Sequence, residues 1–161
     1  MTYTSTRSEL AATADQAILR GLAPDGGLFV PLASPDFHDL SVSLIDKHLP
    51  SLTTLKAAED FVLQVFFPDV PQHVRDDAVA RMLGRFPAAD PTPLVKAGDV
   101  TILELFHGPT GAFKDVALSM LPTFMAHAAN GRRVLVLTAT SGDTGSASMA
   151  GFADCPNASV A

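Results

Sequence analysis

The sequence predicts an α/β fold, with a mostly helical N-terminal part at residues 1–90 and the beginning of a parallel-sheet domain at residues 91–161. Apolar residues recur at helical spacing through much of the first part. From Thr92 onward, short apolar and β-branched runs alternate with helix-like segments. Such alternation is typical of a parallel sheet with helices packed on it, because parallel strands need crossover connections.

Helices are expected to dominate the N-terminal part, and they span residues 8–20, 51–67 and 71–83. Ser8 could cap the first helix, since a serine hydroxyl accepts a hydrogen bond from a free N–H of the first turn. Gly84 ends the last of these helices. Short strands are expected at residues 2–5 and within the loop at residues 21–31.

The second part is expected to contain strands at residues 101–106 and 134–138, helices at residues 114–130 and 142–152, and the opening of another strand at residues 157–161. Pro122 is expected to bend its helix, because proline lacks the N–H of the helical ladder. Asn130 and Gly131 end that helix. The run Val134–Thr138 shows no polar alternation, which predicts a strand buried on both faces.

Composition predicts a soluble globular protein, because 47% of the 161 residues are hydrophobic and 17% are charged. The formal net charge of −6 gives no electrostatic reason to bind nucleic acid or an anionic membrane. The polar first residues contain no signal-peptide core, so we expect a cytoplasmic protein. The single cysteine excludes an internal disulfide, and the histidines lack metal-ligand spacing, so we expect no metal.

Lys114 is a candidate nucleophile. It follows a turn rich in Gly and Pro and begins an expected helix. A lysine amine reacts with carbonyl groups when its charged form is disfavoured, and both partial burial and the positive end of a helix act in that direction. The alternative is an ordinary solvated lysine at the start of a helix. The expected apolar walls around the amine are Leu105, Phe106, Ala112 and Phe113.

The turn Ser141–Gly145 is a candidate anion site, because it joins an apolar run to an Ala-rich helix. The first N–H groups of a helix have no helical partner and can hold a carboxylate or phosphate. Gly142 and Gly145 allow close backbone approach. The turn also contains Asp-Thr-Gly, the catalytic triplet of aspartic proteases. That chemistry needs two carboxylates in a β-rich fold, and the Ala-rich helix argues against it.

Together these segments resemble the threonine synthase family, pyridoxal-phosphate-dependent enzymes of the tryptophan-synthase β-subunit superfamily (fold type II). The family's lysine motif, His-Gly-Pro-Thr-x-Ala-Phe-Lys-Asp, is present at His107–Asp115, with Gly111 at the variable position. The family's Ser-Gly-Asp-Thr-Gly loop is present at residues 141–145. An N-terminal signature is also present, at Tyr3–Arg7 and Gly21–Pro31.

The resemblance implies that the second part begins a three-layer αβα domain, preceded by the family's N-terminal domain. It also implies a carbon–oxygen lyase of threonine biosynthesis, which converts O-phospho-L-homoserine and water to L-threonine and phosphate. Lys114 would hold pyridoxal 5'-phosphate and then move protons among the α, β and γ carbons of the substrate, with the cofactor ring as the electron sink.

The same resemblance implies roles for the second loop. Its residues would hold the substrate α-carboxylate and contact the ring hydroxyl of the cofactor, and they are Ser141, Gly142, Asp143 and Thr144. Because the charge of Asp143 would repel these groups, we expect backbone donors to bind the anion. Within the lysine motif, His107 and Thr110 could contact ligand or only form local hydrogen bonds. Asp115 is expected to complement the helix dipole rather than to act as an acid.

Members of the family are far longer than 161 residues, so we expect this chain to be an N-terminal fragment. The family's phosphate-binding loop and the residue facing the pyridine nitrogen would lie downstream. The isolated chain is therefore expected to be inactive, and an exposed apolar sheet edge would favour self-association. The alternatives are a non-catalytic fragment and a threonine-synthase-like phospho-lyase.

Overall fold

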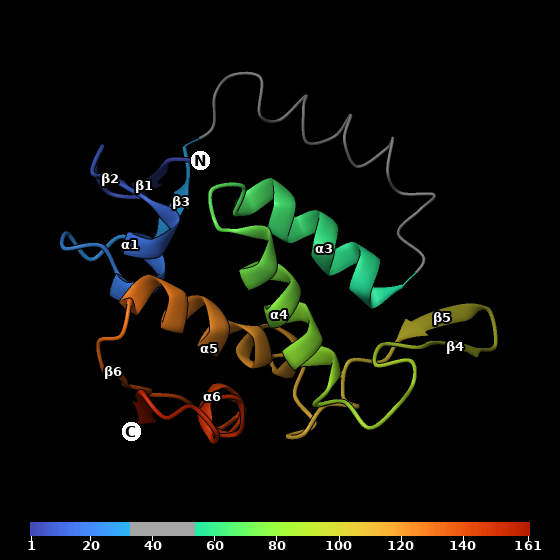
Figure 1. Ribbon diagram of the computed structural model, residues 1–161. Helices are drawn as coiled ribbons and strands as arrows, with labels where there is room; N and C mark the ends of the chain where they lie inside the picture. Colours follow the sequence, from blue (N-terminus) through green and yellow to red (C-terminus); the bar gives the residue numbers. More distant parts are fainter. Residues whose placement is uncertain (33–53) are drawn as a thin grey trace. The chain divides into compact units, whose positions relative to one another are not determined.

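The computed structural model describes residues 1–32 and 54–161 (Figure 1). The chain divides into two compact units, Met1–Arg75 and Asp76–Ala161. The division falls within helix α4 (Gln72–Leu83). The domain boundary expected near residue 90 lies after this helix. That boundary stays a prediction.

The first unit contains a three-stranded antiparallel sheet with the strand order β2-β1-β3. Its strands are β1 (Tyr3–Ser5), β2 (Ala11–Ala12) and β3 (Phe29–Pro31). Tyr3 in the central strand lies opposite both Ala12 and Pro31. The two strands expected from the sequence are confirmed as β1 and β3, whereas β2 was not expected.

Helix α1 (Ala14–Arg20) begins later than the sequence indicated. The hydroxyl of Thr13 accepts a hydrogen bond from the N–H of Gln16 at 3.2 Å, and the Gln16 side chain accepts one from the N–H of Thr13 at 3.0 Å. This reciprocal pair is a capping box. The expected helix start at Ser8 was wrong, because residues 11–12 pair with β1 instead of entering the helix.

The carboxylate of Asp25 joins the two parts of the N-terminal signature. It accepts hydrogen bonds from the hydroxyls of Ser5 and Ser8 and from the N–H of Gly27, at 2.8, 2.5 and 2.9 Å. The bond from Ser8, followed by those from Gly27 and Ser5, lowers the pKa of Asp25. A Cβ on Gly27 would lie 2.1 Å from the Ser5 hydroxyl, so glycine is required there. The signature therefore has a structural role in this unit.

Helix α3 (Leu55–Phe66) is capped by the Thr54 hydroxyl, which accepts a hydrogen bond from the N–H of Ala57 at 3.1 Å. The helix expected at residues 51–67 is confirmed over this range, and residues 51–53 lie outside the described part of the chain. Helix α4 confirms the expected helix at residues 71–83.

Tyr3 connects the sheet of the first unit to the end of α3. Its hydroxyl donates a hydrogen bond to the carbonyl of Phe66, and its ring stacks on Phe67 with the centroids 6.3 Å apart. Burial raises the pKa of the Tyr3 hydroxyl, and the charge of Asp69 adds to the effect. Tyr3 itself is buried, so its contacts belong to the core of this unit.

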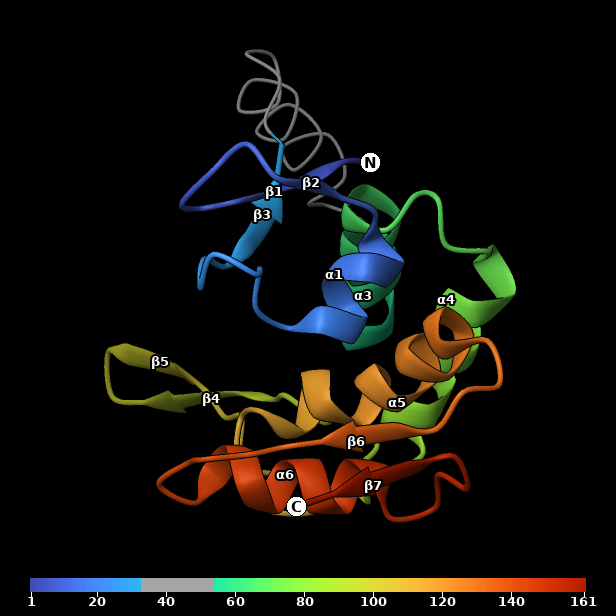
Figure 2. The ribbon, with the colours of Figure 1, turned by 90° about the vertical axis from the view of Figure 1, so that its left-hand side faces the viewer.

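The second unit contains a parallel strand pair with its crossover helix. The elements run in the order α5 (Asp115–Ala129), β6 (Val134–Val136), α6 (Asp143–Phe152) and β7 (Ala158–Val160). Val134 lies opposite Ala158, and Val136 lies opposite Val160. Helix α6 connects the two strands, which Figure 2 shows side by side. The α/β fold and the start of a parallel sheet are thereby confirmed.

Helix α5 ends where the sequence predicts. Asn130 adopts a left-handed conformation with a φ of 48°, and Gly131 follows with a φ of 83°. Pro122 is buried inside α5, which continues through it. The core of this unit is formed largely by α5 and α6, whose buried apolar side chains include Met120, Phe124, Met125, Ala147 and Phe152.

Strand β6 is more exposed than its sequence indicated. Leu135 is 61% exposed, and Leu137 just beyond the strand is 75% exposed. The prediction of a strand buried on both faces was wrong, because β6 has only β7 as a neighbour within the described residues and one face has no covering element there. An apolar strand can be buried on both faces, but a face is buried only where another helix or strand covers it.

A β-hairpin precedes the lysine motif. Strands β4 (Leu94–Ala97) and β5 (Val100–Leu103) pair antiparallel, and all their residues are exposed. The hairpin extends away from α5 and α6 (Figure 2). The strand expected at residues 101–106 is thus confirmed in part, and its partner β4 was not expected.

Candidate functional site

Lys114 occupies the N-cap position of α5, with a φ of −68° and a ψ of −16°. It is half-buried, and its Nζ atom lies 4.7 Å from the centroid of the Phe113 ring, within the range of a cation–π contact. Within the described residues no carboxylate forms an ion pair with this amine. The amine is therefore held against an aromatic ring while it stays available to a ligand.

The apolar walls expected around Lys114 are only partly closed. Ala112 is buried and Leu105 is half-buried, whereas Phe106 and Phe113 are both exposed. Of these residues, only Phe113 is shown beside the amine, and its ring is open to solvent.

Two consecutive turns lead into Lys114. The N–H of Gly111 donates to the carbonyl of Gly108 at 3.2 Å, and the N–H of Asp115 donates to the carbonyl of Ala112 at 3.0 Å. Gly111 has a φ of 71°, a conformation that residues with a side chain rarely adopt. A glycine at this motif position therefore suits the backbone of the first turn.

The side chain of Asp115 points into the first of these turns. Asp115 is 1% exposed, and its carboxylate accepts hydrogen bonds from the N–H and the hydroxyl of Thr110, at 2.9 and 2.7 Å. A Cβ on Gly108 would lie 2.4 Å from the Asp115 Oδ2 atom, so glycine is required for this approach. Thr110 therefore forms local hydrogen bonds, and whether it also contacts a ligand stays open.

His107 also has a local partner. A hydrogen bond of 2.7 Å joins its Nε2 atom to the Oε2 atom of Glu104. The His107 ring lies 4.6 Å from the ring of Phe106, measured between centroids. These contacts fix the imidazole at the entrance of the lysine loop, where it is half-buried.

The second predicted segment forms the N-terminus of α6. The Thr140 hydroxyl accepts hydrogen bonds from the N–H groups of Gly142 and Gly145, at 2.8 and 3.2 Å. Gly142 has a φ of 142°, in the region that favours glycine. The N–H groups of Asp143 and Thr144 have no acceptor within the described residues, so they can donate to an anion.

The predicted site residues therefore lie in two parts of one unit. Ser141, Gly142 and Asp143 are exposed and Thr144 is half-buried. No hydrogen bond or ion pair joins Lys114 to this loop within the described residues. Helix α5 packs against α6, so the two loops belong to helices in contact. Asp143 begins a helix rather than following a strand of a β-rich fold, which does not suit an aspartic protease.

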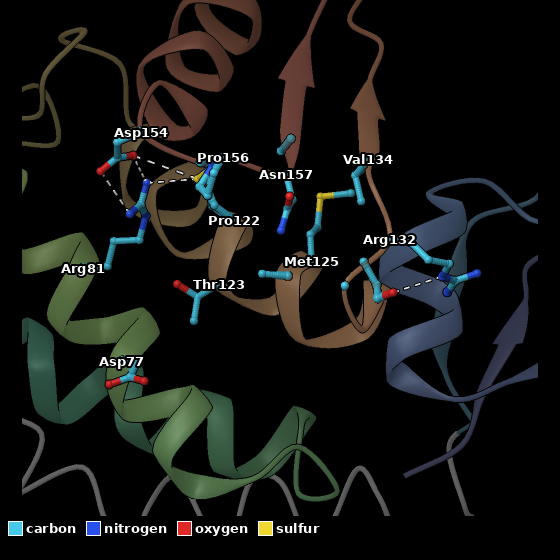
Figure 3. Close-up of a pocket in the computed structure, with 15 residues that line it drawn as sticks. Asp77, Arg81, Pro122, Thr123, Met125, Arg132, Val134, Asp154, Pro156 and Asn157 are labelled. Atoms are coloured by element: carbon cyan, nitrogen blue, oxygen red, sulfur yellow. Dashed lines mark hydrogen bonds and ion pairs between the residues drawn. The ribbon is translucent and has the colours of Figure 1, made fainter.

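A pocket of about 440 Å³ lies elsewhere in this unit, bordered by α4, α5 and the turn that follows α6 (Figure 3). None of the predicted site residues lines it. Arg81 forms an ion pair with Asp154 at its rim, and this partner lowers the pKa of the Asp154 carboxyl. Burial raises the pKa of the Cys155 thiol beside them. Sequence reasoning missed this pocket because its residues come from segments far apart in the chain, with no local spacing to connect them.

Within residues 1–32 and 54–161, no cluster of three or more His, Cys, Asp or Glu residues could hold a metal ion. In the same described residues, no helix is long and apolar enough to cross a membrane.

Comparison with known proteins shows what the chain resembles. Residues 2–73 match the family model described as the threonine synthase N terminus. Threonine synthase from Escherichia coli (strain K12) is 40% identical over 146 residues, which are 90% of this chain and 32% of that protein. The chain is similar to the N-terminal part of threonine synthases. It spans about a third of the length of the threonine synthases that it matches.

Two further relatives extend this result. The crystal structure of pyridoxal-phosphate-bound threonine synthase from Brucella melitensis superposes with a TM-score of 0.82 at 34% identity, covering 99% of this chain and 34% of that one. Threonine synthase-like 1 from Homo sapiens is 38% identical over 141 residues, which are 85% of this chain and 19% of that protein. The chain thus has the fold of the N-terminal part of a threonine synthase.

Proposed function

We propose that this chain is the N-terminal part of a threonine synthase, a lyase that converts O-phospho-L-homoserine and water to L-threonine and phosphate. The observation that carries the proposal is the half-buried amine of Lys114 at the first turn of α5, within the complete lysine motif. The similarity to threonine synthases over 90% of the chain or more supports it.

The residues present fit pyridoxal 5'-phosphate. An amine that forms no ion pair with a carboxylate of the described residues can bind the cofactor covalently, and the open N–H groups at the start of α6 suit an anion. When bound, the cofactor supplies an electron sink for carbanion chemistry. Lys114 would hold it and would then carry protons among the substrate α, β and γ carbons.

The loop at residues 141–144 would orient the substrate. The backbone N–H groups of Asp143 and Thr144 would donate to the substrate α-carboxylate, while Ser141 and Gly142 complete the loop. Asp143 would contact the ring hydroxyl of the cofactor. Because its carboxylate repels a second carboxylate, the backbone rather than the side chain supplies the attraction.

A related activity is the second candidate. It is a threonine-synthase-like phospho-lyase that acts on another phosphorylated hydroxy amino acid, and the chain is also similar to a protein named threonine synthase-like 1. A polypeptide of these 161 residues alone is expected to be inactive, since it spans only about a third of the length of the threonine synthases that it matches. The chain is further proposed to be cytoplasmic and to self-associate through its exposed apolar residues.

Labelling tests the proposal directly. The purified chain is mixed with pyridoxal 5'-phosphate and reduced with borohydride, and the modified lysines are mapped by mass spectrometry. The internal references are the other lysines of the sequence, Lys47, Lys56 and Lys96. Selective modification of Lys114, lost in Lys114→Ala and retained in Lys96→Ala, is the expected result. Equal modification of all four lysines would contradict the claim that this chain prepares the amine for the cofactor.

A further inference from the structure

Asp115 is buried although it is the first residue of a helix. An aspartate at this position usually lies at the surface, where its charge complements the helix dipole. Here both carboxylate oxygens face the preceding loop, and each accepts a hydrogen bond from Thr110. Burial of a carboxylate is unfavourable unless hydrogen bonds replace the lost water. The position of Asp115 therefore depends on the loop, and the conformation of the loop depends on Asp115.

The geometry of the loop makes this dependence specific. The two hydrogen bonds connect the start of α5 to the first turn of the motif, and they span the segment that contains Phe113 and Lys114. Successive residues of a helix point in directions about 100° apart. With the side chain of Asp115 fixed toward Thr110, the direction in which the Cα–Cβ bond of Lys114 leaves the helix is also fixed. Gly108 allows the close approach, because any Cβ there would collide with the carboxylate.

We propose that Asp115 is a positioning residue, whose buried carboxylate holds the turn at Thr110 and thereby sets the direction of the Lys114 amine. The importance of that direction for cofactor binding rests on the proposed function. The loop conformation itself does not, and it can be measured without a cofactor.

Hydrogen exchange in the unliganded chain provides the first test. Asp115→Ala removes both acceptors, and Thr110→Val removes the hydroxyl donor while it keeps the shape and the N–H. We expect exchange in the peptide covering residues 108–114 to accelerate about tenfold or more in Asp115→Ala and by a smaller factor in Thr110→Val. The peptide covering the end of α5 should be unchanged. Asp99→Asn, which removes an exposed carboxylate from the β4–β5 turn, is the matched control.

Conservative variants distinguish positioning from general destabilisation. Thr110→Ser keeps both hydrogen bonds and should retain wild-type exchange. Asp115→Asn keeps one acceptor oxygen for the N–H of Thr110, and its amide can donate to the Thr110 hydroxyl, so it should restore most of the protection lost in Asp115→Ala. In Asp115→Ala combined with Thr110→Val, exchange should match that of Asp115→Ala alone, because both changes remove the same interaction.

The reactivity of Lys114 provides the second readout. Limited acylation by a small amine reagent is followed by mass spectrometry, with the exposed Lys96 as the internal reference. In the wild-type chain, Lys114 should react at a rate distinct from that of Lys96. In Asp115→Ala the two rates should converge, and in Thr110→Ser the difference should remain.

Unchanged exchange and unchanged Lys114 reactivity in Asp115→Ala would overturn the inference, whether or not the chain binds the cofactor. Exchange that accelerates throughout the chain would also overturn it, because the carboxylate would then support the whole unit rather than the loop. Failure of pyridoxal 5'-phosphate to label wild-type Lys114 would count against the proposed function and leave both of these readouts interpretable.

Discussion

Gly151 of α6 packs directly against the backbone carbonyl of Leu118 in α5. A Cβ on Gly151 would lie 2.2 Å from that oxygen and 3.0 Å from its carbon. Two helix backbones approach this closely only where a residue has no side chain. The contact joins the two helices that carry the candidate loops.

Gly151→Ala should therefore destabilise the second unit. The added methyl group forces the helices apart, and overpacking of this kind costs about 1–3 kcal/mol. Urea unfolding monitored by circular dichroism would measure the change. Gly145→Ala in the same helix is the matched control, because its Cβ would meet no atom closer than 3.5 Å. An equal loss of stability in the two variants would contradict the close-contact argument.

Asp25 should make the stability of the first unit depend on pH. Hydrogen bonds lower its pKa below the ordinary value of 3.8. The folded state therefore gains stability above the unfolded pKa, and this gain is lost as the pH falls through the lower, folded pKa. Urea midpoints compared between about pH 7 and pH 3 should show a deficit of Asp25→Asn at neutral pH that disappears in acid.

Ser8→Ala refines this measurement, because the Ser8 hydroxyl is the largest contributor to the lowered pKa of Asp25. The variant should show a smaller deficit than Asp25→Asn with the same dependence on pH. A deficit of Asp25→Asn that stays constant down to the most acidic condition would show that the carboxylate charge is not involved.

The sequence predicted the end of a helix well where a single residue type favours the backbone conformation that ends it. Asn130 and Gly131 end α5 as expected, because few other residues adopt positive φ at low cost. The capping box at Thr13 was also present in the sequence as a Thr-x-x-Gln pattern. It was missed because a competing cap, Ser8, lies upstream, and only the pairing of residues 11–12 with β1 excludes the longer helix.

Contacts between distant residues could not be predicted from local pattern. The bond from Ser5 to Asp25 joins the two parts of the N-terminal signature, but it becomes visible only in the folded unit. In the same way, the sequence showed that Asp115 follows Lys114 but not that its side chain turns back to Thr110. The burial of β6 was overestimated because the sequence of a strand shows its hydrophobicity but not whether another element covers it.

Thr13→Ala should destabilise α1, because it leaves the N–H of Gln16 without its acceptor and breaks the capping box. Loss of a threonine cap costs about 1 kcal/mol. Thr13→Ser keeps the hydroxyl and should retain most of the stability in urea unfolding. If Thr13→Ala and Thr13→Ser unfold at the same midpoint, the cap contributes nothing measurable.

Thr140→Val should loosen the start of α6. The variant keeps the shape of threonine but removes the oxygen that accepts the N–H groups of Gly142 and Gly145. We expect a loss of about 1 kcal/mol, together with faster hydrogen exchange in the peptide covering residues 140–146. Thr140→Ser restores the acceptor and serves as the control. Unchanged exchange at this peptide in Thr140→Val would show that the helix start is held by other contacts.

The exposed apolar side chains in and just after β6 should cause the 161-residue chain to self-associate. Leu135 and Leu137 are exposed beside a strand that has only β7 as its neighbour within the described residues, and an open apolar edge of this kind pairs with other chains. Sedimentation velocity over a range of protein concentrations should show association, and Leu137→Lys should reduce it. Ala139→Lys adds the same charge at an exposed neighbouring position and replaces only a methyl group, so it should reduce association less. An equal reduction by both lysine variants would assign the effect to net charge rather than to the apolar strand, and a monomer at every concentration would exclude self-association.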